Sequence, residues 1–236
     1  MARTSKVGHP WFVLALVSMA QFVVVVDATI TNVALPSMQE ALQISPENLQ
    51  WIVTAYTLAF GGFLMLGGRA ADILGRKRVF IVGVLTFALA SLSVGLSQDE
   101  ATVIVARGVQ GLAAAFMSPA ALSIVLNTFK EGKERNKALG VWGGITSSGA
   151  AIGLLAGGAL TQYLNWRWNF FVNVPIALIV AAFSSRLLVE SRADLGHKHF
   201  DTFGAVTVTG GLMLLVYALT KAPTWGWGDP WTLGLL

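Results

Sequence analysis

ATVIVARGVQGLAAAFMSPAALSIVLNTF, residues 101–129, carries a single charged side chain, Arg107. A transmembrane helix needs about 20 consecutive, mainly apolar residues, so this stretch is long enough to cross a bilayer. A second lone charge, Asp27, interrupts the apolar run FVVVVDATITNVALP. A charge at the middle of a membrane helix costs at least about 2.5–3.5 kcal/mol on insertion scales. Two such charges of opposite sign predict a polar site inside a membrane protein, and an ion or proton pathway.

The composition also places the chain in a membrane. Hydrophobic residues make up 55% of the 236 residues and charged residues 12%, about half of the charged share of a soluble domain. No stretch alternates apolar and polar residues as the strands of a membrane barrel do. The sequence therefore predicts an all-α integral membrane protein whose surface contacts the lipid bilayer. The candidate spans, free of Asp, Glu, Lys and Arg, are residues 7–26, 48–68, 79–98, 108–129, 138–166, 168–185 and 202–220.

The basic residues between these spans predict the orientation. Lys and Arg concentrate in the cytoplasmic loops of membrane proteins. Here four basic clusters alternate with connections that hold only Arg167 and Lys221. The pattern predicts a multi-pass protein of the cell membrane with a cytoplasmic N-terminus and with the connections 37–50 and 97–100 outside. The clusters are Arg3 and Lys6; Arg69, Arg76, Lys77 and Arg78; Lys130, Lys133, Arg135 and Lys137; and Arg186, Arg192 and Lys198.

Enzyme chemistry finds little support in the sequence. The chain has no cysteine, which excludes disulfides, thiolate metal sites and a cysteine nucleophile. No nucleophile–base pair or phosphate-binding loop stands out, and His197 and His199 form too short a tract for a metal site. The net charge of +4 follows the loop asymmetry and does not indicate nucleic acid. We expect neither a metal nor a cofactor, and no enzymatic activity.

The connection after the second span reads GGRAADILGRKR, residues 67–78. Gly68 is expected to let the second helix approach a neighbour closely, and Gly75 to permit the sharp reversal of a short loop. Asp72 can accept hydrogen bonds from a helix N-terminus or pair with a basic residue. The segment resembles the signature G-x-x-x-D-x-x-G-R-K of the major facilitator superfamily, which implies a cytoplasmic gating loop that latches one conformation. The matching residues are Gly68, Asp72, Gly75, Arg76 and Lys77.

Other segments resemble the fourteen-helix drug/proton antiporters of this superfamily, the EmrB/QacA type. DATITNVALP at residues 27–36 is similar to the signature of their first helix, and WRWNFFVNVP at 166–175 to the start of their sixth. RGVQG at 107–111 is similar to the fourth-helix motif R-x-x-Q-G. The fifth span resembles the antiporter motif G-x-x-x-G-P-x-x-G-G, with Leu154 at the proline position, which puts the family's kink in doubt. Its glycines, expected to serve close packing and gating, are Gly149, Gly153, Gly157 and Gly158.

The resemblance also implies how the chain is divided. Residues 1–10 form a cytoplasmic N-terminus, and residues 11–189 correspond to the six-helix N-terminal half of a transporter. A cytoplasmic loop at 190–201 precedes a seventh span at 202–220, which matches the first of two helices inserted between the halves. Residues 221–236 are expected to form an outer loop and the start of an eighth helix. The chain is therefore expected to be truncated or partial, and to need a C-terminal half or self-association.

Helical geometry places the two lone charges at similar depths. Asp27 lies roughly 13 Å below the outer end of the first span at Pro36, and Arg107 lies roughly 10 Å below the same surface, at 1.5 Å rise per residue. We therefore expect the first and fourth spans to pack side by side, with both charges facing one cavity. The fourth span presents one small and polar face, formed by Arg107, Gln110, Gly111, Ala114 and Ser118. On the first span, Asp27 and Thr31 share one face while Gln21, Thr29 and Asn32 fall nearly opposite, and the sequence does not decide which lines the cavity.

Together these features predict a proton-coupled exporter of small lipophilic or cationic compounds, driven by the proton gradient. Asp27 is the expected proton or cation site, with Arg107 biasing its protonation and Gln110, Thr31 and Asn32 beside it in the cavity. A purely structural Asp27–Arg107 ion pair is the alternative. The rival functions are a proton-coupled carrier of one specific solute on the same fold, and a membrane assembly subunit that transports nothing. Because one half supplies one wall of a transport cavity, the chain alone is not expected to transport.

Overall fold

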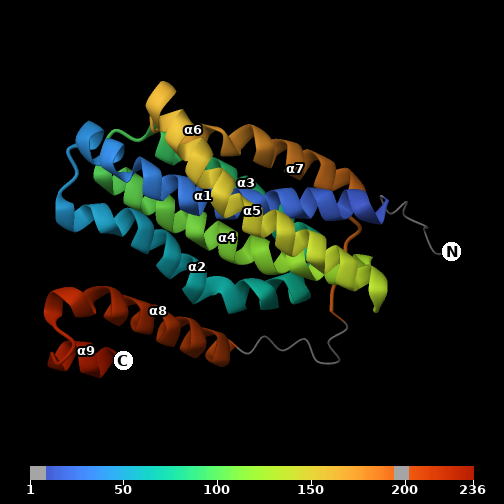
Figure 1. The fold of residues 1–236 in the computed structure, drawn as a ribbon. Coiled ribbons are helices and arrows are strands. Elements are labelled where there is room, and N and C mark those ends of the chain that lie inside the picture. Colours follow the sequence, from blue (N-terminus) through green and yellow to red (C-terminus); the bar gives the residue numbers. More distant parts are fainter. Residues whose placement is uncertain (1–8, 194–201) are drawn as a thin grey trace.

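The computed structural model describes residues 9–193 and 202–236, and these residues are helical throughout, apart from short connections (Figure 1). Within the described residues, seven helices are long and apolar enough to cross a membrane, when α6 and α7 are counted as one span. The all-α membrane class predicted from the sequence is confirmed. The helices are α1 Pro10–Leu42, α2 Pro46–Leu74, α3 Arg76–Leu96, α4 Glu100–Thr128, α5 Lys133–Tyr163, α6 Trp168–Phe171, α7 Asn173–Leu187, α8 Thr202–Trp225 and α9 Pro230–Leu235.

The long helices lie roughly side by side in one bundle, with α4 near its centre (Figure 1). α4 packs along α2 and α3, and α1 packs along α5 and also contacts α4 and α7. α7 closes the bundle against α3, whereas α8 lies outside it against α2. α5 contacts mainly α1, so much of its surface has no neighbour within the described chain.

The first helix is longer than the sequence predicted. α1 continues through Pro36 and ends at Leu42, where Gln43 turns the chain with a φ of 53°. Pro36 removes one backbone hydrogen bond, but membrane helices tolerate this loss because neighbouring helices and local adjustments satisfy the freed groups. The connection expected at residues 37–50 is thereby reduced to residues 43–45. Ser45 then caps α2 by accepting a hydrogen bond from the backbone of Asn48 at 3.3 Å.

The sixth and seventh spans also differ in detail from the expected ranges. The sixth is divided into the single turn α6 and the longer α7, with Val172 between them. The seventh, α8, runs on past the predicted end at residue 220 to Trp225 and includes Pro223. The segment DPWTLGLL then forms the short helix α9, which Asp229 caps by accepting a hydrogen bond from the backbone of Trp231 at 2.8 Å.

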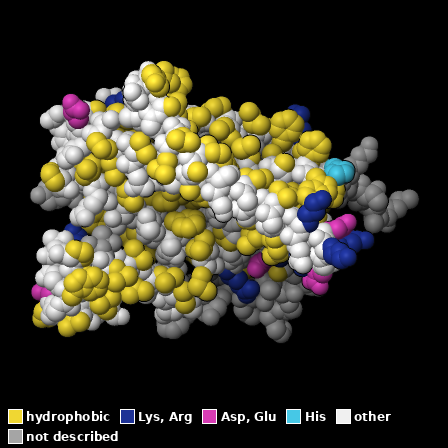
Figure 2. All heavy atoms as spheres, viewed as in Figure 1, with side chains coloured by type: hydrophobic (Ala, Val, Ile, Leu, Met, Phe, Trp, Pro, Cys, Tyr) yellow, Lys and Arg dark blue, Asp and Glu magenta, His cyan; other side chains and the backbone are white. Residues whose placement is uncertain are grey.

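The apolar core has two parts separated by a polar layer. One cluster includes buried apolar residues between positions 13 and 24 of α1 and between 113 and 125 of α4, together with Ala177, Val180 and Ala181 of α7. The other includes Ala34 and Met38 at the far end of α1, together with the start of α4 and the segment around α6. In each of these helices the polar site residues fall between the two clusters. Figure 2 shows apolar side chains along the sides of the bundle and most charged side chains toward its ends, as expected of a membrane protein.

Candidate functional site

An ion pair between Asp27 and Arg107 forms the centre of the polar layer. Arg107 Nη1 of α4 lies 2.5 Å from Asp27 Oδ2 of α1. Asp27 is 0% exposed and Arg107 1% exposed. The sequence predicted that the first and fourth spans pack side by side with both charges facing one cavity; α1 and α4 are in contact and the two side chains meet. They are enclosed by the helices of this half, however, and do not line an open cavity.

Two neutral amides complete the coordination of the Asp27 carboxylate. Gln110 Nε2 of α4 donates to Asp27 Oδ1 at 3.0 Å, and Asn173 Nδ2 at the start of α7 donates to the same oxygen at 2.8 Å. Both amide side chains are buried. Three donors thus surround the carboxylate, and an ionised carboxylate, which only accepts hydrogen bonds, can satisfy all three.

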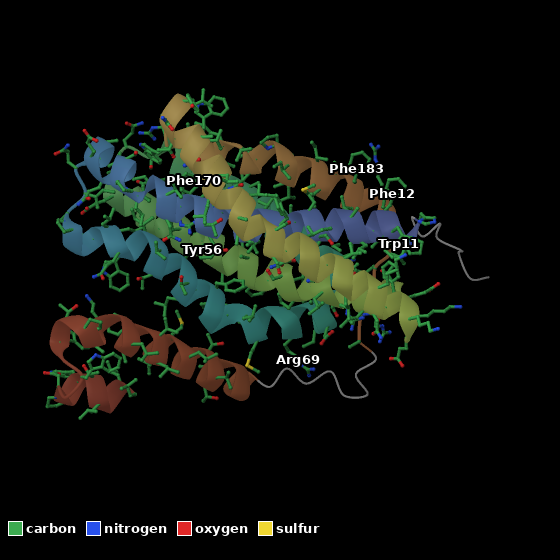
Figure 3. The ribbon with its side chains drawn as sticks, in the orientation of Figure 1. Trp11, Phe12, Tyr56, Arg69, Phe170 and Phe183 are labelled. Carbon is green, nitrogen blue, oxygen red and sulfur yellow. The ribbon has the colours of Figure 1, made fainter. Side chains whose placement is uncertain are left out.

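Arg107 has further neighbours that suit a cation. Its Nη1 also donates to Gln110 Oε1 at 2.9 Å, and its Nε donates to the backbone oxygen of Ile52 in α2 at 3.2 Å. The guanidinium carbon lies 4.3 Å from the ring centre of Tyr56 and 5.9 Å from that of Phe170. Both aromatic residues are labelled in Figure 3. Cation–π contacts of this kind are worth about 2 kcal/mol or more when desolvated.

Sequence reasoning missed two members of this network, Asn173 and Ser91. Asn173 Nδ2 donates a second hydrogen bond to Ser91 Oγ of α3 at 3.0 Å, and Ser91 Oγ donates to the backbone oxygen of Phe170 at 2.9 Å. The network therefore joins α1, α3, α4, α6 and α7. Asn173 lies within WRWNFFVNVP, which was singled out as a whole, but nothing in that segment indicates that this asparagine reaches Asp27.

The other expected cavity residues are placed on different faces. Thr31 is buried beside Asp27, but its hydroxyl donates to the backbone oxygen of Asp27 at 2.7 Å within the same helix. Asn32 is exposed and donates to the backbone of Ala28 at 2.9 Å. The buried face of α1 is therefore the one with Asp27 and Thr31. The small face of α4, expected to line a cavity, instead packs inside the bundle: Gly111, Ala114 and Ser118 are all buried.

Glycines on α2 and α4 allow these helices to approach closely. On α2 the glycine at the contact is Gly67 and not Gly68, which the sequence predicted. A β-carbon on Gly67 would overlap the backbone oxygen of Ala115, and one on Gly111 would overlap that of Tyr56. At Gly68 it would meet only Pro119 Cβ at an ordinary 3.6 Å. The expectation that Gly68 permits the close approach is therefore wrong, since Gly67 faces α4.

The turn between α2 and α3 is built as the sequence predicted. Gly75 separates the two helices with a φ of 112°, a conformation that glycine adopts without steric cost. Asp72 Oδ1 pairs with Arg76 Nη2 at 2.9 Å, one helical turn away. Asp72 does not cap a helix, because another carboxylate occupies the N-terminus of α3.

That carboxylate belongs to Glu190, just after α7, which sequence reasoning did not single out. Its Oε1 accepts the backbone N–H of Lys77 at 3.1 Å and its Oε2 that of Arg78 at 3.2 Å. Lys77 in turn donates through Nζ to the backbone oxygens of Ser185 and Leu188, at 2.7 and 2.8 Å. The α2–α3 turn is thus fastened to the end of α7.

Three of the four glycines expected on α5 contact α1. A β-carbon on Gly149 would lie 3.2 Å from Val25, one on Gly157 would lie 3.0 Å from Ile30, and one on Gly153 would overlap the Thr29 hydroxyl. Gly158 has nothing within 4 Å and takes no part in this packing. Leu154, at the position of the antiporter proline, is 53% exposed, and α5 runs unbroken from Lys133 to Tyr163.

Metal binding has no support in the part of the chain that the structure describes. No group of three or more His, Asp or Glu side chains there is arranged to hold an ion. His197 and His199 lie outside the described residues.

The sequence profile of the Major Facilitator Superfamily matches residues 17–236. The chain belongs to the major facilitator superfamily. Its members are membrane transporters rather than enzymes, and the chain is accordingly a multi-pass membrane protein.

Several superfamily relatives are similar over almost the whole chain. The puromycin resistance protein pur8 of Streptomyces alboniger is 49% identical over 96% of this chain and 44% of its own length. The tetracenomycin C resistance and export protein of Streptomyces glaucescens is 40% identical over 97% of this chain and 42% of its own length. The multidrug resistance protein Stp of Mycobacterium tuberculosis (strain CDC 1551 / Oshkosh) is 36% identical over 91% and 40%. The chain spans less than half the length of these relatives.

Solved structures of two other transporters share the fold. A peptide transporter POT in complex with sulfate has a TM-score of 0.67 at 16% identity, over 94% of this chain and 48% of the transporter. The human organic anion transporter MFSD10 has a TM-score of 0.66 at 17% identity, over 90% of this chain and 56% of that transporter. At these identities the likeness establishes the arrangement of the helices.

Proposed function

We propose that this chain is the N-terminal half of a proton-coupled exporter of small lipophilic, often cationic compounds. The observation that carries the proposal is the buried Asp27 carboxylate, held by Arg107, Gln110 and Asn173 between two apolar clusters. Ionisable side chains inside membrane proteins mark proton relays and transport pathways because their insertion is costly. A bundle that needed only packing would be served by apolar side chains at these positions.

The names of the relatives support the export of drug-like compounds. Puromycin, tetracenomycin C and cephamycin appear in the names of three of them, at 49%, 40% and 41% identity, and another is named for multidrug resistance. We therefore favour a broad drug exporter over a carrier of one specific solute.

Protonation of Asp27 supplies a physical link between the proton gradient and the bundle. Uptake of a proton cancels the negative charge and leaves Arg107 as an unpaired buried cation. Breaking a buried pair in this way is strongly unfavourable, by about 3–5 kcal/mol. Protonation therefore favours a rearrangement in which Arg107 finds another partner or reaches water, and such a rearrangement can be used for alternating access.

We propose that the α2–α3 turn lies on the cytoplasmic side, together with the N-terminus. The supporting observation is the basic character of the turn, which holds Arg76, Lys77 and Arg78. In that orientation Glu190 and Lys77 fasten the cytoplasmic ends of α3 and α7. The turn is then suited to act as the gating loop.

The proposed transport unit needs a second half. Carriers of this kind rock one half against the other around a site at their interface. Much of α5 is exposed in this chain, and Asn32 of α1 is exposed too. We propose that a C-terminal half, or a second copy of this chain, covers these surfaces.

The test is transport in vesicles with an imposed pH gradient, followed with puromycin and with a fluorescent lipophilic cation. The protein is this chain completed by the C-terminal part of pur8, of which the chain spans 44%. We expect gradient-dependent export that Asp27→Asn abolishes. The matched control is Asp99→Asn, which removes an exposed carboxylate outside the site and should leave export unchanged.

Three outcomes would contradict the proposal in different ways. Unchanged export in Asp27→Asn would place proton coupling elsewhere. Export of a single compound, with the other ignored, would favour a specific carrier. Gradient-dependent export by the 236-residue chain alone would show that the second half is not required.

A further inference from the structure

The hydrogen bonds around Asp27 determine which atom donates in the side chains of Ser91, Asn173 and Gln110. Ser91 has one hydroxyl hydrogen, which it donates to the Phe170 oxygen, so it accepts from Asn173. The two hydrogens on Asn173 Nδ2 therefore point to Ser91 Oγ and to Asp27 Oδ1. Gln110 likewise directs its nitrogen to Asp27, and its oxygen accepts from Arg107. Only donors face the carboxylate.

A proton arriving at Asp27 therefore requires one neighbour to become an acceptor. Asp27 Oδ2 faces Arg107, which has no acceptor atom. Gln110 cannot turn its amide over, because its NH₂ group would then face the Arg107 guanidinium in place of Oε1. Asn173 has no such obstacle, since neither of its contacts is a cation.

Turning the amide of Asn173 over gives the protonated Asp27 an acceptor for its new hydrogen. The oxygen Oδ1 would then stand where Nδ2 stands now, 2.8 Å from Asp27 Oδ1 and 3.0 Å from Ser91 Oγ. A carbonyl oxygen accepts two hydrogen bonds, here one from the Asp27 acid and one from the Ser91 hydroxyl. Ser91 then gives up its hydrogen bond to the Phe170 oxygen.

We propose that Asn173 is the positioning residue for the proton on Asp27, and that its amide turns over when Asp27 is protonated. The inference rests on the proposed function, in which Asp27 is the proton site. It adds a change of hydrogen-bond direction. After protonation Asp27 and Ser91 donate to Asn173, where before they accepted from it, whereas Gln110 and Arg107 remain donors toward Asp27.

The reversal transmits the protonation state from α1 to two other helices. Asn173 is the first residue of α7, and Ser91 lies on α3. The charged group facing Asp27 is Arg107 of α4, and the ionisable Tyr56 of α2 lies over that guanidinium. α3 and α7 contribute the neutral Ser91 and Asn173, and α5 presents glycines to α1. The protonation of Asp27 therefore affects α3 and α7 only by changing which of their side-chain atoms donate and which accept hydrogen bonds.

Isotope-edited infrared difference spectroscopy tests this on the reconstituted 236-residue chain. One sample carries ¹³C in the aspartate carboxyl groups and another ¹³C in the asparagine side-chain amide. A pH titration follows the carboxylic acid band that is absent in Asp27→Asn. We expect an asparagine carbonyl band to shift with the same midpoint, and this shift to vanish in both Asp27→Asn and Asn173→Leu.

The variants separate positioning from a structural role. Asn173→Leu removes a hydrogen bond that is stronger to the anion than to the acid, so the proton affinity of Asp27 should rise roughly threefold to tenfold. Asn173→Ser, whose hydroxyl can donate or accept, should restore most of the normal midpoint. Asn169→Leu is the matched control, because Asn169 is buried nearby and donates to Thr161, not to Asp27. It should leave the midpoint unchanged.

The possible failures are distinguishable. An Asp27 acid band that titrates while the asparagine bands stay constant would overturn the Asn173 proposal and leave the proposed function standing. An Asp27 that takes up no proton at any pH at which the chain stays folded would overturn both. The wild-type measurement does not depend on the folding of any Asn173 variant.

Discussion

The carboxylate of Glu190 lies directly over Gly75, where a β-carbon would stand 2.5 Å from its Oε1. The missing side chain of Gly75 leaves room for the carboxylate to reach the N-terminus of α3. There it accepts the backbone N–H groups of Lys77 and Arg78, which have no partner within the helix. A residue distant in the sequence therefore caps α3, and the cap joins the α2–α3 turn to the end of α7.

Removal of this cap should loosen the turn. Glu190→Ala leaves two backbone donors without their charged acceptor, and such hydrogen bonds are worth about 1.5–3 kcal/mol each. We expect a lower unfolding temperature and faster amide exchange at Lys77 and Arg78, measured by hydrogen–deuterium exchange. The control is Glu131→Ala, whose 86% exposed side chain pairs with Arg135 and should contribute under about 1 kcal/mol. Equal effects of the two variants would contradict the capping role.

Substitution of adjacent glycines in α2 should have opposite consequences. Gly67→Ala places a methyl group against the backbone of Ala115, which cannot move aside as a flexible side chain would. Overpacking of this kind costs typically about 1–3 kcal/mol. Gly68→Ala makes only an ordinary contact with Pro119 and should be neutral or slightly stabilising. Thermal unfolding of both variants in detergent measures the difference, and a larger loss in Gly68→Ala would contradict the contact of Gly67 with α4.

These glycines show how far the sequence could predict the structure. The spans and the depth match of Asp27 and Arg107 follow from hydropathy and from a fixed helical rise, which are local properties. The choice between Gly67 and Gly68 depends on how α2 is rotated about its axis, and that rotation is set by side chains on α4. The sequence shows both glycines, but it does not show how α2 is rotated, so it could not identify which glycine contacts α4.

The same limit explains the missed residues of the site. Asn173 is one of several asparagines in the chain, and it reaches Asp27 only because α7 begins at that residue, after the turn α6. Glu190 belongs to a connection, where an acidic residue has no periodic signal. Both contacts join segments more than 100 residues apart, so no local pattern could identify them.

A matched pair of substitutions in α5 tests its packing on α1. Gly153→Ala would press a methyl group onto the Thr29 hydroxyl, whereas Gly158→Ala would enter open space. We expect the first to destabilise the chain by about 1–3 kcal/mol and the second to be neutral in this chain. The measurement is the unfolding midpoint, supported by cross-linking between cysteines introduced on α1 and α5. An unaffected cross-link in a stable Gly153→Ala chain would show that α5 does not rely on this approach.

The start of α4 should be sensitive to acid. The backbone N–H and the hydroxyl of Thr102 both donate to Asp99 at 2.8 Å, and these bonds lower the pKa of the Asp99 carboxyl. Because the pKa is lower in the folded chain, the stabilisation is complete above the usual aspartate pKa and is lost as pH falls through the lowered value. The Thr102 amide signal in an NMR titration should report this loss. Asp99→Asn, which does not titrate, should abolish it, and a persistent transition would assign it to another group.

The two charges of the site should differ in what their removal costs. Asp27→Leu leaves Arg107 as a buried cation that cannot give up its proton, so we expect a loss near the upper end of the about 3–5 kcal/mol typical of a broken buried pair. Arg107→Met leaves Asp27, which can take up a proton and become neutral, so its cost should be smaller and should fall further as pH decreases. The double variant removes both charges and should recover most of the loss, although Gln110 and Asn173 then lack their acceptor. Unfolding midpoints of the four chains at two pH values give the coupling. Additive losses in the double variant would show that the pair contributes no joint stability, and a pH-independent cost of Arg107→Met would show that Asp27 does not accept a proton inside the folded bundle.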